Sequence, residues 1–133
     1  MSEGPAPNPP RILVAEDEFL VYLALEEELR ANGFEVLGPF TTVRAIHEAL
    51  QRETVDMALL DINLGGELIY PVADILLARK VPFAFLSGYA ARALPECYRD
   101  VPRLDKPCDP AMLLALLRRL GETNAPKTEL PVA

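Results

Sequence analysis

Short apolar runs alternate with longer segments of helical periodicity over most of the chain. The runs span residues 12–15, 34–37, 57–60, 83–86 and 101–104. Each run has the length of a strand, and apolar residues recur at helical spacing in the segments between them. Such alternation is typical of βα units, which build a parallel sheet with helices on both faces. We therefore predict an α/β fold, and the 133 residues suit one domain of ordinary size.

Each predicted helix carries one apolar stripe that would face the sheet. The first helix is expected over residues 18–31, and either Thr41 or Thr42 can cap the second. The third should begin near Tyr70 and the last near Pro110. The stripes, in chain order, are Tyr22, Leu25 and Leu29; Val43, Ile46, Ala49 and Leu50; Val72, Ala73, Ile75 and Leu76; and Leu113, Leu116, Leu117 and Leu120.

The helical pattern is weakest over residues 88–100. This segment lacks a clear apolar period and is broken by Pro95, so a fourth helix there should be short or mobile. Both ends of the chain are polar and interrupted by proline. We expect a flexible tail over residues 1–10, one folded domain over 11–121 and a second flexible tail over 122–133.

Composition and charge argue against several classes of function. The formal net charge is −7, whereas a DNA-binding surface needs clustered Lys and Arg, so direct DNA binding is not expected. The N-terminal residues have neither a basic flank nor an apolar stretch, and no apolar run approaches the ~20 residues of a membrane-spanning helix. We therefore expect a cytoplasmic protein without a membrane partner. Cys97 and Cys108 lack CxxC spacing and are expected to be reduced thiols.

Polar residues follow four of the apolar runs. Glu16 and Asp17 follow the first run, Asp61 the third and Ser87 the fourth, and Lys106 comes shortly after the fifth. In an open α/β sheet, ligands bind beyond the carboxyl ends of the strands, where these side chains would gather. Taken singly, each has a simpler explanation, because Asp17 can cap a helix, Asp61 and Ser87 can form turns, and Lys106 can be a solvated amine. Their common placement favours a site.

The chemistry of this set suggests phosphoryl transfer. Carboxylates repel one another by up to about 4 kcal/mol per pair at ~4 Å and an effective dielectric near 20, so the group needs a cation, and oxygen ligands suit Mg²⁺. A carboxylate beside Mg²⁺ can attack a phosphoryl donor and form an aspartyl phosphate. Lys106 and Ser87 are the residue types that would hold the phosphoryl oxygens.

The order of these features resembles the chemotaxis-regulator-like receiver domains of bacterial response regulators. An acidic pair, an Asp, a Ser or Thr and a Lys-Pro follow the first, third, fourth and fifth strands, and the resemblance covers residues 11–120. It implies a flavodoxin-like fold, with a doubly wound five-stranded parallel sheet in strand order 2-1-3-4-5. It implies a Mg²⁺ site formed by Glu16, Asp17, Asp61 and the carbonyl of Asn63. It also implies phosphorylation of Asp61, contacts from Ser87 and Lys106 to the phosphoryl group, and a cis peptide between Lys106 and Pro107.

A narrower resemblance concerns residues 82–89, Pro-Phe-Ala-Phe-Leu-Ser-Gly-Tyr. They look like the variant receivers with a Phe-x-Phe-x-Thr-Gly-Tyr signature, which are mostly single-domain proteins. Glu16 and Ser87 stand where Asp and Thr are commoner in receivers. Arg103 stands where most receivers place an aromatic switch residue. Tyr89 is the candidate replacement for that switch, and a packing role for its ring is an equal alternative.

The resemblance implies a single-domain response regulator of a two-component phosphorelay. A sensor histidine kinase or a histidine phosphotransfer protein would phosphorylate Asp61, and residues 88–100 with the last helix would signal to a downstream protein partner. Such a chain, a monomer or weak homodimer, phosphorylates and dephosphorylates itself and is not a turnover enzyme. One alternative is a pseudo-receiver binding module that acts without phosphorylation. Another is a small phosphatase of the haloacid dehalogenase kind, although such enzymes carry an Asp-x-Asp motif after the first strand.

Overall fold

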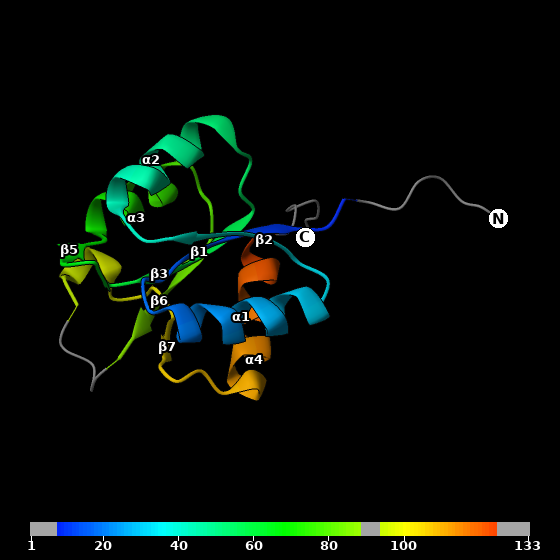
Figure 1. Ribbon diagram of the computed structural model, residues 1–133. Coiled ribbons are helices and arrows are strands. Elements are labelled where there is room, and N and C mark those ends of the chain that lie inside the picture. The colour runs from blue at the N-terminus through cyan, green and yellow to red at the C-terminus, as the bar shows by residue number, and fades with distance from the viewer. Residues whose placement is uncertain (1–7, 89–93, 125–133) are drawn as a thin grey trace.

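Five parallel strands form the central sheet of the computed structural model, which describes residues 8–88 and 94–124 (Figure 1). The strands are β1 (Arg11–Ala15), β2 (Glu35–Phe40), β3 (Met57–Asp61), β6 (Phe83–Ser87) and β7 (Arg103–Asp105). They lie in the order β2-β1-β3-β6-β7, which is 2-1-3-4-5 when the parallel strands alone are counted. The predicted α/β fold, flavodoxin-like and doubly wound, is confirmed.

Helices cover both faces of the sheet. The helices α1 (Phe19–Ala31) and α4 (Pro110–Asn124) pack on one face, and α2 (Val43–Arg52) and α3 (Tyr70–Ala78) pack on the other (Figure 1). The continuous apolar run of β1 follows from this arrangement. Ile12 and Val14 join the core under α1 and α4, whereas Leu13 and Ala15 join the core under α2 and α3. Because both faces of such a strand are covered by helices, polar side chains are expected beyond its end rather than along it.

The predicted helical stripes are buried with two exceptions. Every predicted stripe position of α1 and α4 is buried. Val43 in α2 and Ile75 in α3 are only partly buried, because they lie at the border of the core under those helices. Of the two candidate caps, Thr42 is the one used, since its hydroxyl accepts a hydrogen bond from the Ala45 amide at 3.1 Å.

A short antiparallel hairpin after β3 was not predicted. It consists of β4 (Asn63–Leu64) and β5 (Glu67–Leu68), where the sequence indicated only a turn. Gly65 and Gly66 form its tip with φ angles of 57° and 89°, which glycine adopts without steric cost. The hairpin extends from the end of β3 toward the start of α3.

The connection from β6 to β7 contains one short helix in its described part, the 3₁₀ helix η1 (Glu96–Tyr98). Residues 89–93 lie outside the described residues, so the predicted mobility of this segment stays a prediction. The last helix extends to Asn124, so the expected domain boundary at residue 121 falls within it. Cys97 and Cys108 are free thiols, as predicted. Within the described ranges, no helix combines the length and the apolar character needed to cross a membrane.

The cap of α2 gives a first testable prediction. Changing Thr42→Ala removes the side-chain acceptor for the Ala45 amide and should lower the free energy of unfolding by about 1 kcal/mol. Urea denaturation followed by circular dichroism measures this loss. Thr41→Ala is the matched control, because Thr41 is an exposed neighbour outside the cap. Equal losses in both variants would contradict the assignment of the cap to Thr42.

Candidate functional site

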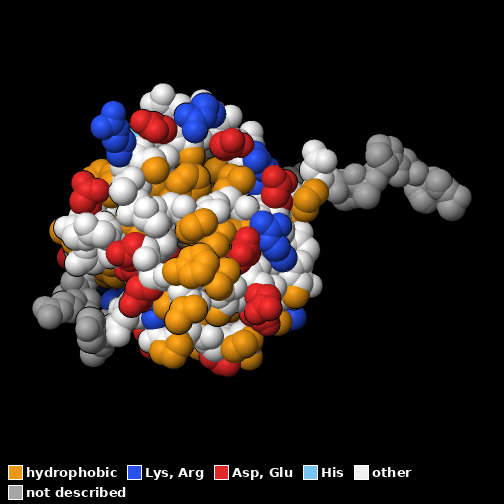
Figure 2. Space-filling model, viewed as in Figure 1, with side chains coloured by type: hydrophobic (Ala, Val, Ile, Leu, Met, Phe, Trp, Pro, Cys, Tyr) orange, Lys and Arg blue, Asp and Glu red, His pale blue; other side chains and the backbone are white. Residues whose placement is uncertain are grey.

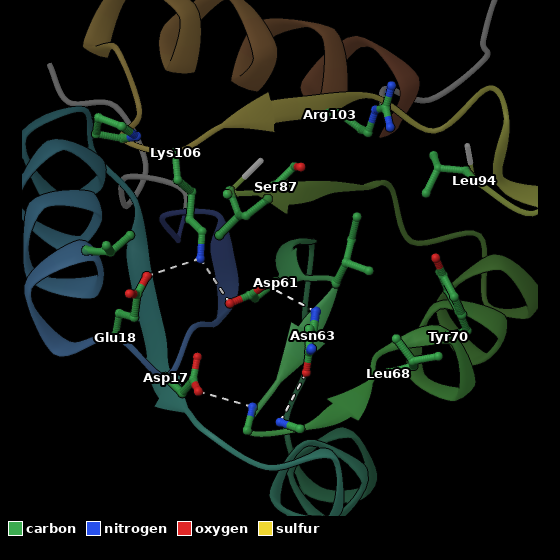
Figure 3. Close-up of a pocket in the computed structure, with 17 residues that line it drawn as sticks. Asp17, Glu18, Asp61, Asn63, Leu68, Tyr70, Ser87, Leu94, Arg103 and Lys106 are labelled. Carbon is green, nitrogen blue, oxygen red and sulfur yellow. Dashed lines mark hydrogen bonds and ion pairs between the residues drawn. The ribbon is translucent and has the colours of Figure 1, made fainter. Parts of the chain in front are cut away.

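The polar residues at the strand ends meet in one pocket beyond the carboxyl edge of the sheet (Figure 3). Because β1, β3, β6 and β7 run parallel, their carboxyl ends lie at the same edge. The pocket has a volume of about 870 Å³. Its lining includes five of the predicted site residues: Asp17, Asp61, Asn63, Ser87 and Lys106. The predicted switch residue Tyr89 lies outside the described residues.

Three carboxylates form an acidic group in and beside this pocket. Glu16, Asp17 and Asp61 each offer an oxygen, and these oxygens all lie within 4.8 Å of one another. Glu16 is 1% exposed and Asp61 is 7% exposed, whereas Asp17 is exposed to solvent. Burial raises the pKa of both Glu16 and Asp61, since a buried carboxylate loses the hydration of its charged form. An all-oxygen group of this kind could hold a divalent cation.

Lys106 lies against the two buried carboxylates. Its Nζ atom is 3.1 Å from Glu16 Oε1 and 3.1 Å from Asp61 Oδ2. Burial alone would lower the pKa of this amine, but hydrogen bonding and attraction to Asp61 and Glu16 outweigh burial and raise the pKa. The Lys106–Pro107 peptide is cis, as the resemblance implied. The backbone amide of Lys106 also donates to the carbonyl of Ser87 at 2.8 Å, which fixes the start of the loop that carries the lysine.

The β4–β5 hairpin holds two of the carboxylates through backbone amides. The amide of Asn63 donates to Asp61 Oδ1 at 3.2 Å, and the amide of Gly65 donates to Asp17 Oδ2 at 3.1 Å. The side chain of Asn63 accepts from the Gly66 amide at 3.1 Å and so braces the hairpin itself. The predicted metal contact through the Asn63 carbonyl stays a prediction.

Glu18 is a site residue that the sequence analysis missed. Its Oε1 atom lies 3.4 Å from Lys106 Nζ, and its side chain lines the pocket (Figure 3). From the sequence, position 18 is expected only to begin a helix. The available signal was its place directly after Glu16 and Asp17, two residues already assigned to the site.

An aromatic cluster borders the other end of the pocket. The ring of Tyr70 lines the pocket and stacks on Tyr98, with ring centroids 4.8 Å apart and an interplanar angle of 13°. The edge of the Phe85 ring meets both tyrosines, with centroids 6.0 Å from Tyr70 and 5.8 Å from Tyr98. Arg103 of β7 also lines the pocket, and Tyr70 comes from the start of α3.

Structural comparison identifies a similar protein with substantial sequence identity. The solution structure of SdrG from Sphingomonas melonis Fr1 is 34% identical, with a TM-score of 0.77, over 86% of this chain and 98% of the SdrG chain. The BeF3-activated conformation of SdrG, from Pseudomonas melonis Fr1, is likewise 34% identical, with a TM-score of 0.70, over 83% of this chain and 95% of that chain.

Two more distant matches are a receiver domain of the same fold and a relative found by sequence. The receiver domain of the TMAO respiratory system response regulator TorR has a TM-score of 0.77 at 23% identity and covers 88% of this chain and 100% of the TorR chain. The transcriptional regulatory protein PdtaR of Mycobacterium tuberculosis is 29% identical over 100 residues, which are 74% of this chain. The chain spans 49% of the length of PdtaR, about half of that protein. No family model matches the chain.

The lysine network predicts a pH-dependent loss of stability. Lys106→Met would leave Glu16 and Asp61 buried without their cation and should cost about 3 kcal/mol near pH 7 in metal-free buffer. The pKa values of both carboxyls already lie above their usual range, and losing Lys106 raises them further. The folded state then binds more protons than the unfolded state, so the stability of the variant falls as pH rises.

Urea denaturation at pH 5 and at pH 8 measures this effect against Lys80→Met, which removes an exposed lysine. The loss caused by Lys106→Met should shrink at the lower pH, where the two carboxyls become protonated. A loss of the same size at both pH values would contradict the proposed balance of charges.

The acidic group predicts stabilisation by a divalent cation. Adding Mg²⁺ to a hundred times its dissociation constant should raise the free energy of unfolding by about 2.7 kcal/mol. Asp17→Asn removes one carboxylate of the group and should abolish most of this gain, whereas Asp100→Asn, an exposed aspartate outside the group, should keep it. Thermal unfolding with and without Mg²⁺ measures the difference. Full retention of the gain in Asp17→Asn would show that the cation binds elsewhere.

Proposed function

The chain belongs to the response regulator receiver domains, and from this premise we propose that Asp61 accepts a phosphoryl group with the help of Mg²⁺. The observation that carries the proposal is the contact between Lys106 and Asp61, a member of the acidic group. A carboxylate nucleophile, a group of oxygen ligands and a fixed ammonium are the parts that this transfer needs. The proximity of Asp61, the acidic group and Lys106 at the carboxyl ends of the parallel strands supports the proposal.

The residues of the pocket suit distinct roles in the transfer. Asp61 forms a new bond from a carboxylate oxygen to phosphorus as the bond to the leaving group of the donor breaks. The Asn63 amide and the Lys106 ammonium each hold one oxygen of this carboxylate, which fixes its orientation. Lys106 and the Ser87 hydroxyl would then contact the phosphoryl oxygens.

The donor chemistry of the acidic group fits Mg²⁺, which prefers oxygen ligands. Glu16, Asp17, Asp61 and the carbonyl of Asn63 would hold the ion. Bound there, the ion supplies positive charge that lowers the repulsion between the carboxylates and the phosphoryl group. The existence of a BeF3-activated conformation of SdrG adds support, because this small anion resembles a phosphoryl group in size and charge distribution.

The phosphoryl group would come from a sensor histidine kinase or a histidine phosphotransfer protein. Exposed apolar side chains on the two helices that cover one face of the sheet suit contact with a protein partner. Phe19 and Leu20 of α1 are 63% and 79% exposed, and Met112 of α4 is 59% exposed. Hydrophobic side chains gather on the face of the molecule that carries these helices (Figure 2). A downstream partner is proposed to read the phosphorylated state by protein contact.

Further parts of the proposal rest on sequence and charge. We place the chain with the single-domain variant group that carries the Phe-x-Phe-x-Thr-Gly-Tyr signature, acting in the cytoplasm as a monomer or weak homodimer. Phe83, Phe85 and Ser87 of that signature lie on β6. The formal charge of −7 supports signalling without direct DNA binding. Transfer to Asp61 is stoichiometric in this proposal, followed by self-catalysed loss of phosphate rather than enzymatic turnover.

Intact mass spectrometry tests the proposal directly. Incubation with acetyl phosphate and Mg²⁺ should add one phosphoryl group to the unmutated chain. Asp61→Asn should gain none, because it lacks the nucleophile, and a sample with a chelator in place of Mg²⁺ should gain none either. Absence of the gain, repeated with phosphorylated histidine proteins as donors, would favour the pseudo-receiver that acts without phosphorylation. Continuous turnover of a chromogenic phosphate ester would favour a phosphatase instead.

A further inference from the structure

Glu18 is the carboxylate in contact with Lys106 that faces the solvent. Its side chain is 66% exposed, whereas the side chains of Glu16 and Asp61 are 0% and 10% exposed. It contacts the ammonium at 3.4 Å from the side of the pocket that is lined by the start of α1 (Figure 3). A donor molecule that reaches Asp61 enters the same pocket and so passes close to this charge.

The side chain of Glu18 serves neither the helix nor the acidic group. Glu18 is the N-cap residue of α1, yet its side chain makes no capping hydrogen bond to any described residue. Its backbone amide donates to Glu16 Oε2 at 2.9 Å, so the backbone is fixed by the site while the carboxylate extends to Lys106. Among the described residues, the group that could hold a metal ion consists of Glu16, Asp17 and Asp61 and does not include Glu18.

The charge of Glu18 is therefore balanced differently from that of the other carboxylates. A cation in the acidic group would offset Glu16, Asp17 and Asp61, but Glu18 is offset by Lys106. When Lys106 turns toward the oxygens of an incoming phosphoryl group, Glu18 loses part of that balance and repels the incoming anion. The repulsion grows with the negative charge of the donor, and salt screens it because Glu18 is exposed.

We propose that Glu18 is a specificity-determining residue that disfavours small, doubly charged phosphoryl donors relative to singly charged ones. The inference rests on the proposed phosphorylation of Asp61 and identifies a property of the same site. Acetyl phosphate represents the first class, and its transfer to Asp61 breaks the bond from phosphorus to the acetyl oxygen and releases acetate. Phosphoramidate represents the second class, because its protonated nitrogen offsets one charge; its transfer breaks the phosphorus–nitrogen bond and releases ammonia.

The test compares rates of phosphoryl gain in the unmutated chain and in Glu18→Gln, by intact mass in the presence of Mg²⁺. Removing the charge should speed transfer from acetyl phosphate about threefold to tenfold and transfer from phosphoramidate by less than about threefold. Taking the ratio of variant to unmutated rate for each donor cancels the different reactivities of the donors. Raising the salt from about 0.05 M to about 0.5 M should reduce the larger ratio toward one.

Two further variants separate charge from structure. Glu18→Asp keeps the charge and should stay close to the unmutated rate. Glu48→Gln removes an exposed glutamate that pairs with Arg44 across one turn of α2, and it should leave both rates unchanged. The inference is overturned if Glu18→Gln speeds both donors equally, if its ratio does not respond to salt, or if it matches Glu48→Gln.

A second measurement separates this inference from the function on which it rests. If the unmutated chain gains no phosphoryl group from any donor, the proposed phosphorylation fails. The affinities for sulfate, a doubly charged anion, and for BeF3⁻, a singly charged one, measured by titration calorimetry in the presence of Mg²⁺, then read the effect of Glu18 without transfer. Binding of sulfate that is severalfold tighter in Glu18→Gln, with a smaller gain for BeF3⁻, would support electrostatic repulsion by this residue. Equal gains for the two anions, or no gain for sulfate, would overturn it.

Discussion

Parallel pairing of the strands determines where the charged groups of this protein lie. β1 and β3 are covered on both faces, so after Arg11 their side chains are apolar until the strands end. Glu16 follows directly after β1, and Asp61 is the last residue of β3. The carboxyl ends of parallel neighbours share one edge of the sheet, and this brings carboxylates from distant parts of the sequence together. The acidic group is thus a consequence of the sheet, and a balancing charge becomes necessary.

Among the described residues, Lys106 supplies the balancing positive charge, and it lies in the loop after the last strand. Its ammonium contacts Glu16, Glu18 and Asp61 at once. The two buried carboxyls keep raised pKa values even with this partner, because burial outweighs the attraction. The same amine that stabilises the resting pocket would contact a phosphoryl group in the proposed reaction. Any rearrangement of Lys106 therefore changes the balance at all three carboxylates.

Local sequence signals predicted most of the fold and the common location of Asp17, Asp61, Asn63, Ser87 and Lys106 at one edge of the sheet. Strand runs, helical stripes and the residues at strand ends are each visible within a few positions of the chain. The β4–β5 hairpin was missed because strands of two residues are too short to show a period. Glu18 was missed because its role depends on an approach of Lys106 from 88 positions away in the sequence. The stacking of Tyr70 on Tyr98 depends in the same way on tertiary structure.

In the pocket, Asp61 lies between a group of ion pairs and a group of aromatic contacts (Figure 3). On one side lie the ion pairs of Lys106 with Glu16 and Glu18, which respond to charge. On the other side lies Tyr70, which belongs to a packed aromatic cluster with Tyr98 of η1. Burial, together with the hydrogen bond to Asp74, raises the pKa of Tyr98, so its hydroxyl stays protonated and anchors η1 to α3. Through the stacked rings of Tyr70 and Tyr98, the pocket therefore contacts η1, the helix that precedes β7. This contact is present although Arg103 stands on β7 where an aromatic residue is commoner in receivers.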